Sequence, residues 1–137
     1  MTGVKAFCIP RAETPDYLPR VYEWLDAAYA VHDLPMPMDL AETLLNGHRQ
    51  LWISWAPEGR ILCGVITRLA KRRSGLHCEI EAAGGVEVHR WIRAMATIED
   101  YAKRELCAKG TLQGRPGWER LLRHYRRSQI VLELELP

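Results

Sequence analysis

The stretch ILCGVITRLAKRRSGLHCEIEAAGGVEVHRWIRAM, residues 61–95, decides the fold of this chain. Residues 61–69 and 76–82 are two runs of β-branched and apolar residues, separated only by the turn-forming sequence KRRSG and its flanks. A similar run, residues 51–55, precedes them across the turn APEGR. Successive strands joined by short turns lie antiparallel to one another, so the sequence predicts an antiparallel meander.

A long amphipathic helix is predicted after this meander. Its apolar side chains recur at the spacing i, i+4, i+7 and i+11, which marks one face of a helix: Trp91, Met95, Ile98 and Ala102. Gly110 provides a C-terminal stop, and we expect this helix to be the longest in the chain. We also expect Trp91, Met95 and Ile98 to be buried against the sheet.

Further elements are predicted on the N-terminal side of the meander. Residues 4–9 have the composition of a strand. A helix follows, for which we expect Asp16 to be the N-cap and Pro19 to lie in the first turn, where a missing N–H costs nothing. A second, short helix is expected to begin at Asp39.

The C-terminal side is predicted to hold a brief extended piece, TLQG, a short helix that starts near Pro116, and a closing strand in SQIVLELEL, residues 128–136. In that last stretch leucine and isoleucine occupy alternate positions, as in a half-buried strand: Ile130, Leu132, Leu134 and Leu136. The complete order is β-α-α-β-β-β-α-β-α-β, which is a mixed α/β fold in a single domain, residues 1–137.

Length and composition limit the class of protein. A chain of 137 residues suits one domain, and a net charge of +2 is too small to indicate a dedicated nucleic-acid binder. No apolar run approaches membrane-spanning length and no signal peptide is evident, so we expect a cytoplasmic protein without membrane contact. The four cysteines and five histidines lack metal-site spacing, and we expect reduced thiols and no metal.

This order of elements, with particular residues at its joints, resembles the GNAT superfamily of N-acetyltransferases. ILCGVITRL is similar to the third strand of that family, and GRPGWERLLRHYRRSQIVLELEL is similar to its closing helix, corner and final strand. Within the superfamily, the chain resembles small GNAT-like proteins of tailed phages and prophages, which carry a similar Gly-Gly joint and G-R-x-G-W segment. The resemblance implies an acetyl-CoA cofactor. It also implies, as an alternative to an ordinary cytoplasmic protein, one that is phage-encoded or virion-associated.

The Gly-Gly joint between the meander and the helix has two interpretations. The resemblance implies that the backbone of Gly84, Gly85 and Val86 binds the pyrophosphate, and a helix N-terminus with flanking glycines suits an anion. The other interpretation is a tight turn that needs a positive φ. The opening Arg or Gln of the family's loop is missing, and Val86 and Glu87 replace its second small residue. Acetyl-CoA and no cofactor at all therefore both stay open.

Three polar residues, His77, Glu79 and Glu81, alternate on the last meander strand and are predicted to share one face. Either glutamate is a candidate general base that takes a proton from an amine. The alternative is that the three residues mark a solvent-exposed face, opposite three core-facing residues: Cys78, Ile80 and Ala82.

The closing helix supplies one more catalytic candidate. The resemblance aligns Tyr125 with the aromatic residue of the family's corner, and this alignment puts His124 where the family has glycine and Arg120 where many members have a tyrosine. Arginine cannot act as a general acid near neutral pH. Tyr125 is the nearest phenol in the sequence and is therefore the candidate acid.

Two hypotheses about function remain from the sequence. The first is a GNAT-like protein of phage or prophage type that binds acyl-CoA or no cofactor, has weak or absent acetyl transfer, and serves assembly or protein interaction. A protein partner or a homo-oligomer belongs to this hypothesis. The alternative is an active acetyl-CoA-dependent N-acyltransferase that acts on an unknown amine.

Overall fold

A five-stranded sheet with strand order β1-β2-β3-β4-β5 forms the centre of the computed structural model, which describes residues 4–113, 117–128 and 132–137. The strands are β1 (Lys5–Cys8), β2 (Arg49–Trp55), β3 (Ile61–Arg72), β4 (Gly75–Gly85) and β5 (Lys109–Leu112). The first four strands are antiparallel to their neighbours, and β5 lies parallel to β4. The predicted meander and mixed α/β fold are confirmed.

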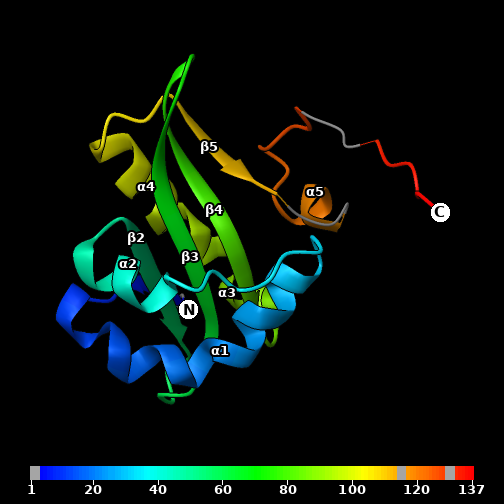
Figure 1. Ribbon diagram of the computed structural model, residues 1–137. Helices are drawn as coiled ribbons and strands as arrows, with labels where there is room; N and C mark the ends of the chain where they lie inside the picture. The colour runs from blue at the N-terminus through cyan, green and yellow to red at the C-terminus, as the bar shows by residue number, and fades with distance from the viewer. Residues whose placement is uncertain (1–3, 114–116, 129–131) are drawn as a thin grey trace.

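Helices cover both faces of this sheet. They are α1 (Thr14–Ala30), α2 (Leu40–Asn46), α3 (Val88–Trp91), α4 (Met95–Arg104) and α5 (Gly117–Leu121), with 3-10 turns η1 (Arg11–Glu13) and η2 (Ile92–Ala94). Figure 1 shows α1 and α2 in front of the sheet and α3 and α4 behind it. The crossover from β4 to β5 runs through α3, η2 and α4, which is why the two strands can be parallel.

Each face of the sheet has its own hydrophobic core. The core beneath α1 and α2 is built around these buried residues: Val21, Leu25, Leu40, Leu44, Leu51, Ile53 and Ile66. The core beneath α3 and α4 is built around another set: Trp52, Val65, Cys78, Ile80, Trp91, Met95 and Ile98. Because both faces of the sheet are covered, the central strands do not alternate apolar and polar residues as strands with one solvent-exposed face do.

The helix after the meander is shorter than predicted. β4 continues to Gly85, and the 3-10 turn η2 divides the remaining predicted helix into α3 and α4. The longest helix is therefore α1, with 17 residues. The predicted buried face is nevertheless confirmed, because Trp91, Met95 and Ile98 are each only 2% exposed. The helical spacing of these three residues predicted which face is buried, and the short 3-10 turn η2 does not rotate that face away from the sheet.

Helix α1 begins earlier than predicted. It starts at Thr14, whose hydroxyl donates to the carbonyl of Arg11 over 2.9 Å, and a proline occupies the first turn at position 15. The predicted N-cap Asp16 therefore lies inside the first turn, and Pro19 lies within the helix. The earlier proline already supplies the N-terminal signal that we assigned to Pro19.

A β-bulge in β4 changes which residues face each core. Ile66 pairs with Ala82 and Thr67 pairs with Ile80, so Glu81 is an extra residue without a partner in β3. Beyond the bulge the alternation is reversed: Ile80 packs in the core beneath α4, whereas Ala82 packs in the core beneath α1. The prediction that Ala82 shares a face with Ile80 is therefore wrong.

The predicted closing strand is absent from the part of it that the structure describes. Residues 132–137 belong to no strand, and Leu132, Leu134 and Leu136 are 87%, 84% and 82% exposed. Ile130 lies outside the described residues. Figure 1 shows this C-terminal segment, in red, extending away from the sheet. Its alternating pattern has no strand partner within the described parts of the chain, and a strand needs one.

Candidate functional site

The two parallel strands separate at one end of the sheet. The pairing of β4 with β5 ends at Ile80 and Leu112, while the pairing of β4 with β3 continues to Gly85. Figure 1 shows β4 and β5 diverging towards α5. Alternate residues of an edge strand direct their N–H and C=O groups away from their one partner. Residues 81–85 of β4 therefore present backbone hydrogen-bonding groups to the space that β5 has left.

A cavity of about 330 Å³ occupies this space, and we call it the β4–β5 cleft. Its walls come from the last turns of α1, the end of β4, α3, the end of β5 and α5. Three tryptophans line it: Trp24, Trp91 and Trp118. The centroids of the Trp91 and Trp118 rings lie 6.1 Å apart, and the two ring planes are tilted relative to each other. The cleft is therefore mainly apolar, with backbone polar groups along one strand.

Two polar side chains, His32 and Gln113, also line the cleft. His32 was not among the site residues predicted from the sequence, and it lies two residues beyond the end of α1 at Ala30. A signal was present, since Trp24, Ala28 and His32 recur every four residues, a spacing that extends one face of α1 into the turn after its last residue, Ala30. All three line the cleft, and Trp24 and Ala28 also pack against the core beneath α1, so this side of the helix contributes to both.

Gly84 and Gly85 line the cleft as extended residues of β4. They are not the tight turn that one interpretation required, because the positive φ falls on Glu87, at 53°. Glycine is needed here for close packing. A Cβ on Gly84 would lie 2.6 Å from the carbonyl oxygen of Trp24, and one on Gly85 would lie 2.1 Å from that of Leu62.

Val86, the third predicted cofactor-binding residue, does not line the cleft. Its N–H donates to the carbonyl of Leu62 over 2.9 Å, and its own carbonyl accepts the indole N–H of Trp91 over 2.9 Å. Both backbone groups are therefore used within the fold. The N–H groups of Val88 and His89 are in the first turn of α3, where no preceding helical carbonyl is available to them.

Two arginines neutralise the negative charge of Glu87 beside the cleft. Its carboxylate accepts from Arg60 over 2.6 Å and from Arg90 over 3.3 Å, and both arginines also reach Glu58. The hydrogen bond from Arg60 is the main reason why the pKa of Glu87 lies below its ordinary value. The negative charge of Glu87 is thus paired with two guanidinium groups.

Glu81, the first candidate base, belongs to a half-buried charge network on the α1 side of the sheet. Its carboxylate accepts from Arg49 over 2.8 Å and from the Tyr29 hydroxyl over 3.0 Å, and it pairs with Arg68 over 3.0 Å. Burial and then Glu81 raise the pKa of Tyr29 far above its ordinary value. Arg49 also donates to Thr43 over 3.0 Å, so the network joins α1 and α2 to the sheet.

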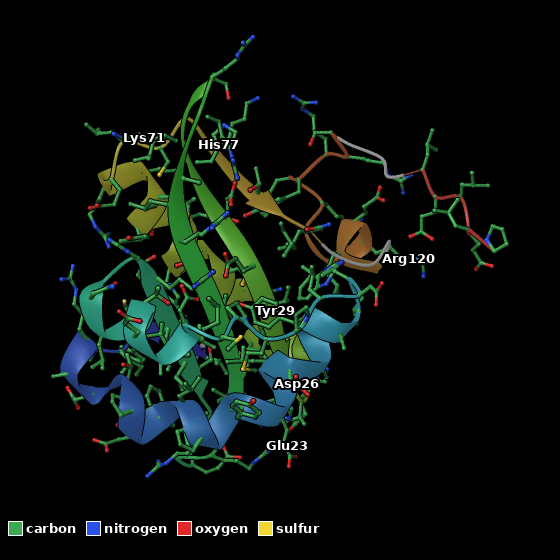
Figure 2. The ribbon with its side chains drawn as sticks, viewed as in Figure 1. Glu23, Asp26, Tyr29, Lys71, His77 and Arg120 are labelled. Atoms are coloured by element: carbon green, nitrogen blue, oxygen red, sulfur yellow. The ribbon has the colours of Figure 1, made fainter. Side chains whose placement is uncertain are left out.

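Glu79, the second candidate base, is paired with arginines of the neighbouring strand. Arg68 donates to it over 3.1 Å, and Arg72 donates to it as well. Burial acts to raise the pKa of Glu79, but these hydrogen bonds prevail and hold it below its ordinary value. His77 is buried near the tip of the β3–β4 hairpin, beside Lys71 in Figure 2, and its Nε2 lies 2.7 Å from the Ser74 hydroxyl.

Tyr125, the candidate acid, does not line the cleft. It packs against the core beneath α4, and burial and then Glu99 raise its pKa above the ordinary value. Arg120 lies exposed on α5 (Figure 2). The structure therefore brings two of the predicted cofactor-binding residues, Gly84 and Gly85, to the cleft and places all three catalytic candidates outside its wall.

A second hollow of about 520 Å³ lies at the β1–β2 end of the sheet, between Arg11, His48 and Tyr101. None of the residues singled out from the sequence lines it. Among the described residues, no cluster of three histidine, cysteine, aspartate or glutamate side chains can hold a metal ion. None of the described helices is long and apolar enough to cross a membrane.

Comparison with known proteins identifies the fold. No family model and no curated protein matches the sequence. Among solved structures, an aminoglycoside acetyltransferase, HMB0005, from an uncultured soil metagenomic sample matches with a TM-score of 0.71 at 10% identity, over 99% of both chains. The aminoglycoside 6'-N-acetyltransferase AAC(6')-Ih of Acinetobacter baumannii matches with a TM-score of 0.66 at 11% identity, over 98% of this chain and 99% of that one.

A third similar structure is glucosamine-6-phosphate N-acetyltransferase from Arabidopsis thaliana. Its TM-score is 0.60 at 10% identity, and the match covers 99% of this chain and 100% of that chain. These matches extend over nearly the whole chain and place it in the fold of the GNAT acetyltransferases. At such low identity they show the fold alone, so the activity must be argued from the cleft.

Proposed function

We propose that the β4–β5 cleft binds the acyl and pantetheine arm of acyl-CoA and that this protein is an acyl-CoA-dependent N-acetyltransferase. The observation that carries the proposal is the separation of two parallel strands after Ile80 and Leu112, which opens an apolar cavity along an unpaired strand edge. A pantetheine arm contains two amide groups on a narrow apolar chain. It can hydrogen-bond to such an edge much as an added peptide strand does.

The fold supplies distinct environments for the two ends of this ligand. Apolar walls around Trp91 and Trp118 suit the arm, which would lie along the backbone of Gly84 and Gly85 at the strand edge. Arg60 and Arg90 lie next to the joint, where Glu58 and Glu87 already pair with both guanidinium groups, so a phosphate would have to displace one of these carboxylates to bind them.

Acyl-CoA, when bound, supplies an activated thioester. Transfer to an amine then requires a group that accepts a proton from the nucleophile. His32 is the imidazole in the cleft wall, and imidazole is the side chain that most often performs such proton transfer near neutral pH. Glu81 would serve by holding Tyr29 in place on α1, one turn before His32.

Binding is tested by titrating acetyl-CoA into the protein in a calorimeter. Two exposed alanines near the end of α1 offer a matched pair, because Ala27 lines the cleft and Ala30 does not. Ala27→Trp should weaken binding at least tenfold by filling the cleft, while Ala30→Trp should leave it unchanged. No binding by the unaltered protein at millimolar acetyl-CoA would refute the proposal.

Transfer is tested by thiol release across a panel of amines. His32→Gln should lower turnover and keep acetyl-CoA binding, whereas His48→Gln, remote from the cleft, should change neither. Turnover that survives His32→Gln and is lost in Glu79→Gln or Tyr125→Phe would return the catalytic role to the residues predicted from the sequence.

A second candidate function is binding of acyl-CoA without transfer. It is favoured by the arginine pairing of Glu79 and Glu81, which leaves neither carboxylate free to act as a base without losing an ion pair. Under this candidate the protein serves assembly or protein interaction, and a phage or prophage origin rests on the sequence resemblance alone. Saturable binding with no thiol release from any amine would select it.

A further inference from the structure

The first residues of β2 form an uncovered edge of the sheet. Strand β1 ends at Cys8, and the chain turns away at Pro10 into η1. Between them, Ile9 donates its N–H to the carbonyl of Leu51 over 2.8 Å, which shows that Leu51 directs its backbone groups towards β1. Backbone groups alternate in direction along a strand, so Arg49 also directs its N–H and C=O to the side that β1 has left.

The hollow of about 520 Å³ lies against this edge, and we call it the β1–β2 hollow. It extends round the edge of the sheet, from the end of α2 on one face to the end of α4 on the other. Its walls include four aliphatic side chains: Ile9, Leu44, Leu51 and Leu69. Among the described residues, none lines both this hollow and the β4–β5 cleft. Ligand pockets commonly measure about 300–1,000 Å³, so the hollow has the size of a small-molecule site.

Arg11 supplies a cation at one end of the β1–β2 hollow. A Cβ on Gly47 would lie 2.3 Å from the guanidinium carbon of Arg11, so the arginine packs directly on the backbone of the glycine that ends α2. No carboxylate of the described residues forms an ion pair with Arg11. The side chain is exposed, so an anion can reach this charge from solvent.

The other charges of the hollow decide which anion fits. The guanidinium of Arg49 already pairs with Glu81 and Asp39. Glu105 lies at the α4 end, where burial and then the charge of Glu105 raise the pKa of Tyr101 to about 12. A dianionic phosphate would meet only one available guanidinium and the repulsion of Glu105. A carboxylate carries a single charge, which one guanidinium can match.

We propose that the β1–β2 hollow binds a small carboxylate with an apolar body, such as a short fatty acid. The carboxylate accepts hydrogen bonds from the Arg11 guanidinium and the backbone N–H of Arg49, and the apolar body lies on the aliphatic walls and the Tyr101 ring. An exposed ion pair alone contributes little, so both parts of the ligand are needed for measurable affinity. This site is independent of acyl-CoA binding in the β4–β5 cleft.

The first test is calorimetric titration with hexanoate. The protein should bind it saturably, while acetate, which lacks the apolar body, and hexanamide, which lacks the charge, should each bind at least tenfold more weakly. Arg11→Gln should weaken hexanoate binding about tenfold, because a charge-assisted hydrogen bond is lost. Arg20→Gln is the matched control and should change nothing, since Arg20 is also exposed but lies over the Tyr17 ring and does not line the hollow. No binding of hexanoate at millimolar concentration, or equal binding of hexanamide, overturns the proposal.

The second test locates the bound hexanoate. Cys8 is exposed and lines the hollow, whereas the partly exposed Cys107 does not line it, so the two thiols are a reporter and its control. Hexanoate at about ten times its dissociation constant should slow the alkylation of Cys8 by iodoacetamide about tenfold, measured by mass spectrometry, and leave Cys107 unaffected. Ala27→Trp, which fills the β4–β5 cleft, should leave hexanoate affinity unchanged. Unprotected Cys8, equal protection of both thiols, or loss of binding in Ala27→Trp would place hexanoate elsewhere and overturn the proposal.

Discussion

The substitution Gly84→Ala tests how closely α1 approaches β4. A Cβ at this position would lie 2.6 Å from the carbonyl oxygen of Trp24 and 3.1 Å from its carbonyl carbon. Both atoms belong to the backbone in the middle of α1, so no side chain can rotate away to make room. Either the helix or the strand must move, and overpacking of this kind typically costs about 1–3 kcal/mol.

Urea unfolding followed by circular dichroism measures this cost. Gly110→Ala is the matched control, because Gly110 also lies in a strand but its Cβ would meet nothing closer than 3.8 Å. That contact is ordinary, and we expect the control to stay within about 0.5 kcal/mol of the original protein. Gly84→Ala should also weaken acetyl-CoA binding, since Trp24 and Gly84 both line the cleft. Equal stability of the two variants would refute the close packing of α1 on β4.

Three further changes address the cores and the charges. Met95→Ala should lower the free energy of unfolding by about 2–5 kcal/mol in the same urea assay, because Met95 is 2% exposed in the core beneath α4. Thr67→Val should cost about 1–3 kcal/mol, measured by thermal unfolding, since the buried Thr67 hydroxyl accepts the indole N–H of Trp52 over 2.9 Å. Glu79→Gln should lower stability at pH 7, because the pKa of Glu79 is depressed in the folded state. The stabilisation is complete above the unfolded pKa of 4.5 and is lost as the pH falls through the lower folded pKa, so the loss caused by the substitution should shrink below pH 4.5. A loss that stays constant in unfolding curves recorded from pH 7 to pH 3 would contradict that last expectation.

The parts of the fold that were predictable are those governed by local pattern. Short turns determined the antiparallel meander, and helical spacing determined the buried face of Trp91, Met95 and Ile98. Such signals need no knowledge of distant residues. The bulge at Glu81 depends on the register between β3 and β4, which the composition of one strand does not contain. For this reason the facing of Ala82 was mispredicted.

The candidate site was predictable only where a residue type itself carries the signal. Gly84 and Gly85 stood out as a pair, although their role is to admit a neighbouring backbone and not to form a turn. Trp24 lies on α1 and His32 in the turn after it, far from β4 in the sequence, and only the packing of α1 on the sheet brings them to the cleft. Their periodicity on α1 was visible, but it could equally have marked a solvent-exposed face.

The separation of β4 and β5 has a consequence for the order of folding. Strands β2, β3 and β4 meet through short hairpins, which cost little chain entropy to close. The cleft instead needs α1, the β4–β5 crossover and α5 in place together, so it combines contacts between distant parts of the chain. Contacts of that kind form late as a rule. A ligand in the cleft should therefore slow unfolding and leave the rate of folding nearly unchanged.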